Sequence, residues 1–352
     1  MAVDDLTISL PEGISQRQVA DAVGISISTV SRTLSGHPRV SSRTRSDVLR
    51  AIDRLSRNAV PDNGRPVRRV IGLTQSLAID GPANRGIDII LEQVLGGAET
   101  AARQAGYMLY TLQNSYSLRS GGGQAFFDEV RGVISAGGLV SRPLIDAFRQ
   151  RRLPTVIIGG HLPDSDVPSV AANSAEGVRQ ATRHLIDLGH RRIGLVNGPT
   201  DTYTSMEKKA GYLSALVDAG ITPDIALIRW HDGPFGFDAG DAMTMTGELL
   251  DLEQRPTAIL FANDSMAVSG MSACRARRLT VPDDISIVGF HDDADARLAS
   301  PQMTTVRVDR LEWGAAAVRR VLDALDNGSM SADRLLLPTE LVVRDSTARP
   351  PA

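Results

Sequence analysis

Apolar residues in the first part of the chain recur every three or four positions, which is the spacing of amphipathic helices. The pattern predicts three short helices, over residues 15–23, 26–34 and 41–55. Residues suited to cap these helices stand at their ends: Ser15, Gln18, Gly24, Ser26, Gly36 and Ser41. The apolar positions that hold the first two helices crossed are Val19, Ala20, Val23, Ile25, Val30 and Leu34. Two short crossed helices of this kind predict a helix-turn-helix.

Beyond residue 69 the pattern changes to short runs that are apolar on both faces, alternating with amphipathic stretches. An example is VIGLT (70–74) before ILEQVLGGAETAARQAG (90–106). This alternation predicts parallel sheets covered on both sides, and its length fits two doubly wound halves. The expected fold class is therefore an all-α helix-turn-helix head plus an α/β two-lobed body. Ligands of such sheets bind beyond the carboxyl ends of the strands, so Gln75 after GLT and His161 after TVIIGG are candidate contacts.

Formal charge is unevenly distributed along the chain. Residues 13–69 hold eleven arginines and four aspartates, a net charge of +7, whereas the whole chain carries −3. A basic head on an acidic body indicates a nucleic-acid contact at the head, although a solvated face is the alternative. Residues 57–69, with two prolines, one glycine and little apolar content, are expected to link a DNA-binding domain at 1–56 to the body.

Composition narrows the class of protein further. No apolar run approaches the roughly 20 residues that span a bilayer, and the start MAVDDLTISLPEG lacks the pattern of a signal peptide. We therefore expect a cytoplasmic protein with no membrane partner. One cysteine, Cys274, is expected to pack as a small residue rather than to act as a reactive thiol. Phosphate-cradling glycine loops, nucleophile elbows and metal-spaced His/Cys sets are missing, so we expect no enzyme, no cofactor and no metal site.

A series of motifs runs through nearly the whole chain: VADAVGISISTVSRTLSG (19–36), VSSRTRSDVLRAIDRL (40–55), HLIDLGHRRIGLVNGP (184–199), AILFANDSMAVSG (258–270), VPDDISIVGF (281–290) and SPQMTTVRVD (300–309). Their order resembles the lactose/galactose-repressor (LacI/GalR) family of bacterial transcription factors. The resemblance implies a homodimer whose heads bind double-stranded operator DNA, as a repressor of carbohydrate uptake or catabolism genes. It also implies a body folded like periplasmic sugar-binding proteins, with an effector in its cleft.

The resemblance also implies how the body is divided. The effector-binding and dimerisation domain would span residues 70–346, with residues 347–352 as a tail. Its N-subdomain would comprise about 70–169 plus 306–329, and its C-subdomain about 170–305 plus 330–346. The last residues, STARPPA (346–352), lack the leucine heptads that make four-chain assemblies in one branch of the family, so we expect a dimer.

The second predicted helix carries the side chains expected at DNA. Recognition helices need short polar side chains near the backbone of DNA and one or two long donors for base edges. Short donors are Ser26, Ser28, Thr29, Ser31 and Thr33. Arg32 is the only long donor, and its fork suits guanine. Family members commonly read bases with two residues early in this helix, here Ile27 and Ser28, which predicts an atypical operator.

Further DNA contacts are expected outside that helix. Thr29 and Ser31, with Ser42 and Arg45 of the third helix, fit phosphate contacts. The linker offers no leucine where the family wedges one into the minor groove, and it is shorter than usual. Its arginines, among them Arg65 and Arg68, could still bind phosphates or a narrow minor groove.

Candidate effector contacts follow the strands of the second half. The resemblance places Asn263 as a ligand contact, whereas Asp264 is either a contact or the N-cap of the next helix. Phe235 matches the aromatic residue that stacks on the ligand, with core packing as the alternative. Lys208 stands where the family has arginine and His291 where it has aspartate, which weakens a clamp for neutral sugars. A sugar acid or a sugar phosphate is therefore a candidate effector as well as an ordinary sugar. The alternative is that the ligand site has decayed or has moved elsewhere.

Two other classes of protein could contain a two-lobed body of this kind. A periplasmic solute-binding protein would share the body, but the basic helix-turn-helix argues against it. A cytoplasmic small-molecule-binding protein with a vestigial head is the other alternative. Whether the effector releases DNA or promotes binding, and what the operator sequence is, do not follow from these residues.

Overall fold

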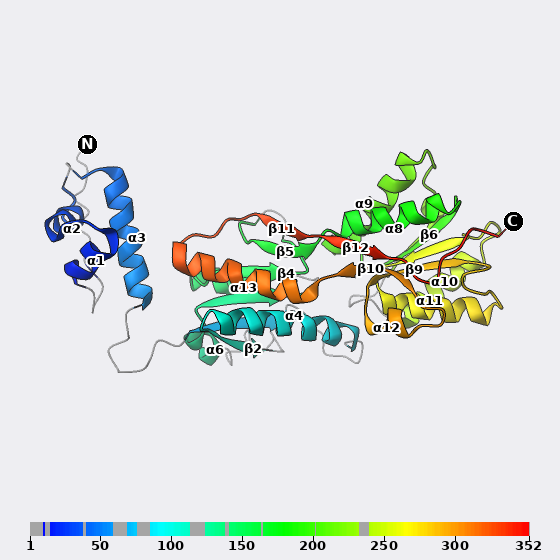
Figure 1. Cartoon of the computed structure of the whole chain (residues 1–352), viewed down its shortest axis with the longest axis horizontal. Helices are drawn as coiled ribbons and strands as arrows, with labels where there is room; N and C mark the ends of the chain where they lie inside the picture. Colours follow the sequence, from blue (N-terminus) through cyan, green and yellow to red (C-terminus); the bar gives the residue numbers. More distant parts are fainter. Residues whose placement is uncertain are drawn as a thin grey trace.

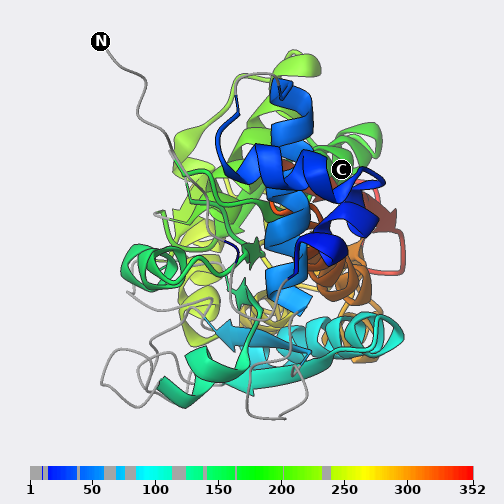
Figure 2. The same cartoon turned by 90° about the vertical axis from the view of Figure 1, so that its left-hand side faces the viewer.

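The computed structural model describes residues 10, 15–37, 40–58, 69–75, 85–112, 124–137, 141–162, 165–200, 202–231 and 239–351. Three helices form the head: α1 (Gln16–Val23), α2 (Ile27–Leu34) and α3 (Ser42–Asn58). In Figure 1, α1 and α2 lie on the side of α3 that faces away from the body, and in Figure 2 they lie together beside it. Their small core consists of Val19, Ala20, Val30, Leu34, Val48, Ala51 and Ile52.

The predicted serine caps of the head and the glycine that ends α1 are confirmed, whereas the C-cap of α2 is Ser35, with Gly36 following it at φ 72°. At Ser15 both halves of the capping box form, because its hydroxyl accepts from Gln18 N and its own N–H donates to Gln18 Oε1, at 3.3 and 2.8 Å. Ser26 caps α2 and Ser41 accepts from Thr44 N at the start of α3. Gly24, at φ 72°, ends α1 in the left-handed conformation that glycine adopts without strain.

The first lobe of the body is a six-stranded parallel sheet with the strand order β11-β5-β4-β3-β1-β2. Its strands are β1 (Val70–Gln75), β2 (Met108–Leu112), β3 (Gly132–Ala136), β4 (Thr155–Ile158), β5 (Ser169–Ala172) and β11 (Arg334–Leu337). Its helices are α4 (Arg85–Gln104), α6 (Gln124–Glu129), α7 (Arg142–Gln150) and α13 (Arg310–Asn327). Helices α4 and α13 pack side by side over one face of the sheet (Figure 1).

The second lobe contains a sheet of order β12-β10-β9-β8-β6-β7, parallel except for the antiparallel pair of β10 and β12. Its strands are β6 (Ile193–Asn197), β7 (Ile228–Trp230), β8 (Ala258–Phe261), β9 (Ser286–His291), β10 (Thr304–Val308) and β12 (Thr339–Val342). Its helices are α8 (Ser174–Asp187), α9 (Tyr203–Asp218), the 3-10 turn Ile225–Leu227, α10 (Ala239–Leu250), α11 (Asp264–Ala276) and α12 (Ala294–Leu298). Cys274 is fully buried in α11, as expected of a packing residue.

The chain passes between the lobes three times, each time a few residues later than the expected subdomain boundaries. Strand β5 keeps residues 169–172 in the first sheet, β10 keeps residues 304–308 in the second, and β11 returns residues 334–337 to the first. The expected boundaries at 169/170, 305/306 and 329/330 are therefore corrected to about 173, 309 and 338. Short strands whose partners come from distant parts of the chain give little periodic signal, so the sequence does not mark where the chain leaves each lobe.

The segment expected to be a tail packs against the second lobe. Ala348 N donates to Ser286 Oγ at 3.0 Å, and Ala348 O lies 2.9 Å from His190 Nε2. His184 Nε2 lies 3.0 Å from Thr347 Oγ1. These contacts give both histidines a structural role. None of the helices in the described parts of the chain is long and apolar enough to cross a membrane.

Candidate nucleic-acid interface and interlobe site

Helix α2 presents one polar face to solvent. Its inward side is formed by Val30, Thr33 and Leu34, all buried. The opposite side exposes Ile27, Ser28, Ser31 and Arg32, one turn apart in pairs, with Ser26 exposed at the N-cap and Thr29 half-buried. Ile27 is 47% exposed, which is unusual for an isoleucine in so small a domain. The exposed face of α2 is therefore short and mostly uncharged, and Arg32 is its single cation.

One of the five hydroxyls that the sequence suggested for DNA is not available. Thr33 is fully buried, and its hydroxyl donates to the Thr29 carbonyl oxygen at 2.8 Å. This backbone bond is a common use of threonine inside a helix. Ser26 Oγ accepts from Thr29 N at 3.2 Å and lies 2.9 Å from Ser28 Oγ. The expectation that Thr33 is a DNA donor is therefore wrong, while the other four hydroxyls stay at or near the surface.

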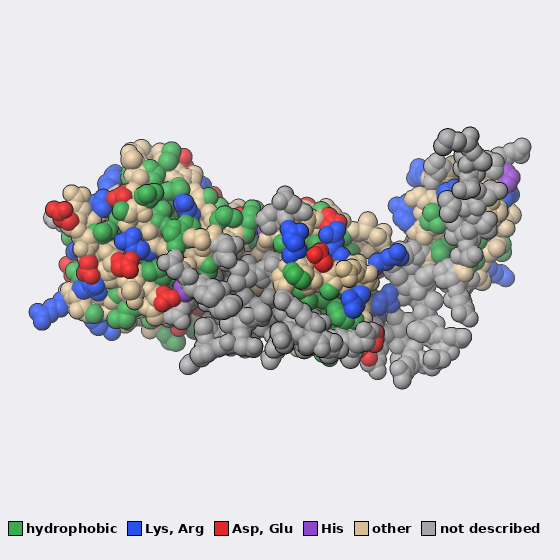
Figure 3. Space-filling view, turned by 180° about the vertical axis from the view of Figure 1, so that it is seen from behind, with side chains coloured by type: hydrophobic (Ala, Val, Ile, Leu, Met, Phe, Trp, Pro, Cys, Tyr) green, Lys and Arg blue, Asp and Glu red, His purple; other side chains and the backbone are tan. Residues whose placement is uncertain are grey.

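Arg32 lies along the exposed face. Its Nε donates to the Ser28 carbonyl oxygen at 3.2 Å, and its Nη2 lies 3.5 Å from Ser28 Oγ. Both bonds are exposed to solvent and easily exchanged for water or for another acceptor. On the side drawn in Figure 3, the described surface of the head shows basic side chains and no acidic ones.

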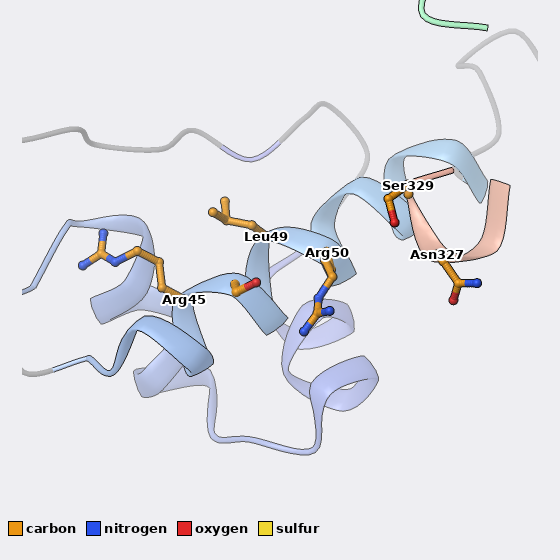
Figure 4. Close-up of a pocket in the computed structure, with 7 residues that line it drawn as sticks. Arg45, Leu49, Arg50, Asn327 and Ser329 are labelled. Atoms are coloured by element: carbon orange, nitrogen blue, oxygen red, sulfur yellow. The ribbon is translucent and has the colours of Figure 1, made fainter. Parts of the chain in front are cut away.

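Arg45 of α3 is half-buried and donates to the His37 carbonyl oxygen at 3.4 Å. It also borders a groove of about 560 Å³ between α3 and the turn after α13. Figure 4 shows Arg45, Leu49 and Arg50 on one wall of this groove and Asn327 and Ser329 on the other. The side chain of Ser42 and residues Arg65 and Arg68 lie outside the described residues, so their expected DNA contacts stay predictions.

The interlobe site begins at the carboxyl end of β8. Asn263 is the N-cap of α11, since its Oδ1 accepts from Met266 N at 2.8 Å. Asp264 is fully buried, and its carboxylate accepts from Thr305 Oγ1 at 2.6 Å and from Asp293 N at 2.7 Å. Burial raises the pKa of Asp264 to about 7. The cap is thus Asn263 and not Asp264, whose carboxyl group ties the start of α11 to β10 and to the turn after β9.

Lys208 of α9 is buried beneath the same strand ends. Its Nζ donates to the Ala262 carbonyl oxygen at 2.8 Å and lies 4.4 Å from the centroid of the Phe290 ring. Burial, together with the positive charge of Arg310, lowers the pKa of Lys208 to about 7. The ammonium is therefore buried against the carboxyl end of β8 and the Phe290 ring of β9, and burial weakens its hold on the proton.

His291 ends β9 in a strained backbone conformation, at φ 115°. Its Nδ1 is buried and has no hydrogen-bond partner within the described parts of the chain. Burial, followed by the charges of Arg310 and Lys208, holds the pKa of His291 well below its usual value. His291 is therefore a neutral hydrogen-bond donor or acceptor at the end of β9.

The other expected contacts are only partly described. His161 is half-buried, with its ring 5.0 Å from that of Tyr203 in α9 and its Nδ1 3.5 Å from Ser169 Oγ. Burial lowers its pKa. The side chain of Gln75 and the whole of Phe235 lie outside the described residues. The structure thus brings Lys208, Asp264 and His291 together, and it places His161 against the other lobe at α9.

Comparisons with known proteins agree with this architecture. Residues 17–56 match the model described as "Bacterial regulatory proteins, lacI family", and residues 182–347 match "Periplasmic binding protein-like domain". The HTH-type transcriptional regulator CelR of Thermobifida fusca is 32% identical over 338 residues, 93% of this chain and 96% of the relative. The chain belongs to the LacI family. It is a DNA-binding transcriptional regulator, and both the predicted family and the predicted fold class are confirmed.

Other LacI-family proteins resemble it along their whole length. The HTH-type transcriptional repressor CytR of Escherichia coli K12 is 29% identical, over 95% of this chain and 96% of its own. A solved CelR–cellobiose complex shares 30% identity at a TM-score of 0.70, covering 95% of this chain and 99% of that one. A lac repressor dimer bound to operator and the anti-inducer ONPF shares 25% identity at a TM-score of 0.67, covering 96% and 100%. These relatives are regulators, and none of them is named as an enzyme.

Within this LacI-family body, sequence reasoning missed the side chains that join the two lobes. Arg310 of α13 is paired with Asp293, which follows β9. Arg334 of β11 donates to both carboxylate oxygens of Glu207 in α9, at 2.8 and 2.9 Å. Its guanidinium also lies 4.2 Å from the centroid of the Tyr203 ring. No sequence signal marks these pairs, because the partners come from different lobes and are as many as 127 residues apart.

Proposed function

We propose that this regulator is a homodimer that represses transcription by laying α2 of each head in the major groove of a two-fold symmetric operator. The exposed polar face of α2, with Arg32 as its one long donor, is the observation that carries the proposal. Arg32 would contact a base, with Ile27 and Ser28 beside it. An isoleucine touches only apolar groups such as a thymine methyl, so the site should differ from one read by two polar residues.

Phosphate contacts would set the register of the head on DNA. Ser26, Thr29 and Ser31 at the N-terminal half of α2 are close enough to the surface to donate to phosphates. Arg45, with Ser42, would serve the same purpose from α3, and Arg65 and Arg68 from the linker. A protein that acts on DNA in a bacterium works in the cytoplasm, and no catalytic step is needed for this function.

A relative supports a second copy of the chain as partner. The lac repressor, 25% identical to this chain over 96% of its length, is a dimer in a solved complex with operator. The same arrangement is proposed here, with one head of each subunit on each half of the operator. Sedimentation equilibrium should show a dimer, and a stable tetramer would contradict the proposal.

The effector would bind between the lobes, beyond the carboxyl ends of the strands. A relative binds cellobiose in a solved complex, which supports a sugar or a sugar derivative here. Asn263, Lys208, His291 and His161, with Gln75 and Phe235, are the proposed surroundings. The buried Asp264 would hold the strand ends in place rather than touch the ligand.

Selection from a random-sequence duplex library with the full chain tests the DNA part of this function. We expect recovered sites with two similar half-sites related by a two-fold axis, because a symmetric dimer presents two equal heads. Recovery of sequences without symmetry, or no enrichment above the starting library, would contradict the proposal.

A further inference from the structure

Arg310 is the most deeply buried cation that joins the lobes. It is the first residue of α13 and is only 1% exposed. Both of its Nη atoms donate to the carboxylate of Asp293 in the other lobe, with Nη2 3.2 Å from Oδ2. Nη1 also donates to Gln93 Oε1 of α4 at 3.3 Å. The outer end of the guanidinium is therefore taken up by protein groups.

The Nε side of the guanidinium has an unsatisfied donor. Arg310 Nε is buried and finds no hydrogen-bond partner among the described residues. The same is true of Nε1 of Trp313, which lies three residues further on and hence on the same face of α13. Leaving a buried donor without a partner costs roughly 1–3 kcal/mol. Two such donors one turn apart on α13 indicate that an acceptor from outside the chain binds there.

These two donors lie where the two lobes meet. A Cβ added to Gly159, just after β4, would be 3.7 Å from the Trp313 ring, which places the indole at the carboxyl end of that strand. Across the junction, the unpartnered Nδ1 of His291 belongs to the end of β9. Nitrogen atoms from both lobes thus remain unsatisfied at the place where a two-lobed body binds its ligand.

The missing partner must be an acceptor. Arginine Nε and tryptophan Nε1 can only donate, and the Nε edge of arginine presents two parallel N–H groups spaced like the two oxygens of a carboxylate. We propose that the effector carries a carboxylate, as a uronic or aldonic acid does, and that the Nε edge of Arg310 binds it while Trp313 Nε1 donates to the acid or to the next hydroxyl. This inference rests on the proposed function, which places the effector between the lobes.

The charges around Arg310 favour binding of an acid, and the negative charge of Asp293 opposes it. Lys208 is close enough for the charge of Arg310 to lower its pKa, so an added anion would let Lys208 hold its proton. Asp293 and Asp264 are the opposing groups. Asp264 is buried with a raised pKa, whereas Asp293 is ion-paired with the Nη end of Arg310. Asp293 thus offsets part of the positive charge that an acid would meet, and removing its charge should favour the acid, which makes that residue a useful probe.

Isothermal titration of the full chain with matched pairs tests the inference. Each acid is compared with its neutral parent: galacturonate with galactose, glucuronate and gluconate with glucose. Glucose 6-phosphate distinguishes a carboxylate from a phosphate. We expect at least one acid to bind at least tenfold more tightly than its parent and than the phosphate. Tighter binding of a neutral sugar or of the phosphate would overturn the inference and leave the proposed function standing.

Variants test the named donors. Trp313→Phe should weaken the acid roughly three- to tenfold, the effect of one hydrogen bond, and Arg310→Gln roughly a hundredfold. Asp293→Asn keeps an acceptor for Nη and removes the repelling charge, so it should tighten the acid several-fold and leave neutral sugars unchanged. Trp230→Phe, in β7, is the matched tryptophan control and should change acid binding less than twofold.

Each result bears on the inference separately from the proposed function. The inference would be overturned if both Trp313→Phe and Arg310→Gln bound the acid as tightly as wild type does. It would also be overturned if Asp293→Asn bound the acid more weakly. Binding of none of the acids would overturn it as well. Operator binding by the same preparations without ligand, measured on selected DNA, shows whether each variant is folded and whether the regulator function itself holds.

Discussion

Helices α4 and α13 of the first lobe touch backbone to backbone at Gly97, and this contact gives a sharp prediction. A Cβ added at Gly97 would lie 1.9 Å from the Leu311 carbonyl oxygen and 2.6 Å from its carbonyl carbon. Ordinary contact begins near 3.4 Å, so α13 would have to move away by more than an ångström. Such overpacking costs about 1–3 kcal/mol, occasionally more.

The neighbouring Gly96 supplies a matched control. A Cβ there meets only the Leu311 Cδ2 atom, at 3.6 Å, which is an ordinary contact. Replacing glycine by alanine inside a helix adds up to about 1 kcal/mol of stability when nothing clashes. Gly96→Ala should therefore raise the free energy of unfolding of the first lobe by up to about 1 kcal/mol, and Gly97→Ala should lower it by roughly 1–3 kcal/mol.

Tryptophan fluorescence during urea unfolding can follow the first lobe alone. The chain has two tryptophans, Trp313 on α13 and Trp230 in the second lobe, so both alanine variants are made in a Trp230→Phe background. The midpoint of the Trp313 transition should move in opposite directions in the two variants. Equal midpoints, or a stabilised Gly97→Ala, would refute the close packing of the two helices.

Two other predictions concern buried polar groups. Because burial raises the pKa of Asp264 to about 7, the folded protein keeps a proton that the unfolded chain releases above about pH 4. The free energy of unfolding should therefore fall as pH rises from 4 to 7, and Asp264→Asn should flatten that slope; an unchanged slope in urea titrations would show that the carboxyl group is ionised throughout. In the head, Thr33→Val should leave operator affinity within about twofold, because its hydroxyl serves the helix backbone, whereas the exposed Ser31→Ala should weaken it. The reverse order in gel-shift titrations would contradict the orientation of α2.

The head could be predicted closely from sequence because its signals are local. Each helix begins at a serine whose hydroxyl accepts a backbone N–H three residues later, and such caps depend on few neighbours. The alternation of strands and helices in the body was also clear up to residue 293. The short strands β5 and β11 were not, since each gains its stability from a partner far along the chain.

Side-chain roles in the interlobe site depended on contacts that sequence could not show. Asn263 and Asp264 are equally suited to cap α11, and the choice is decided by Thr305, which offers Asp264 a buried hydroxyl from β10. Lys208 was expected to face a ligand, but the sequence does not show that its Nζ also packs against the Phe290 ring and donates to the Ala262 carbonyl oxygen. Arg310 received no role at all, because its partner Asp293 comes from the other lobe.

Binding of one selected duplex and its scrambled version, compared between wild type and Arg32→Ala by fluorescence anisotropy at fixed salt, tests the central claim most directly. Wild type should prefer the selected duplex by about a thousandfold or more. Arg32→Ala should bring that ratio close to one while weak binding to both duplexes persists, and Arg45→Ala should weaken both duplexes alike. Equal binding of both duplexes by wild type, or a preference that survives in Arg32→Ala, would contradict recognition of DNA through the exposed face of α2.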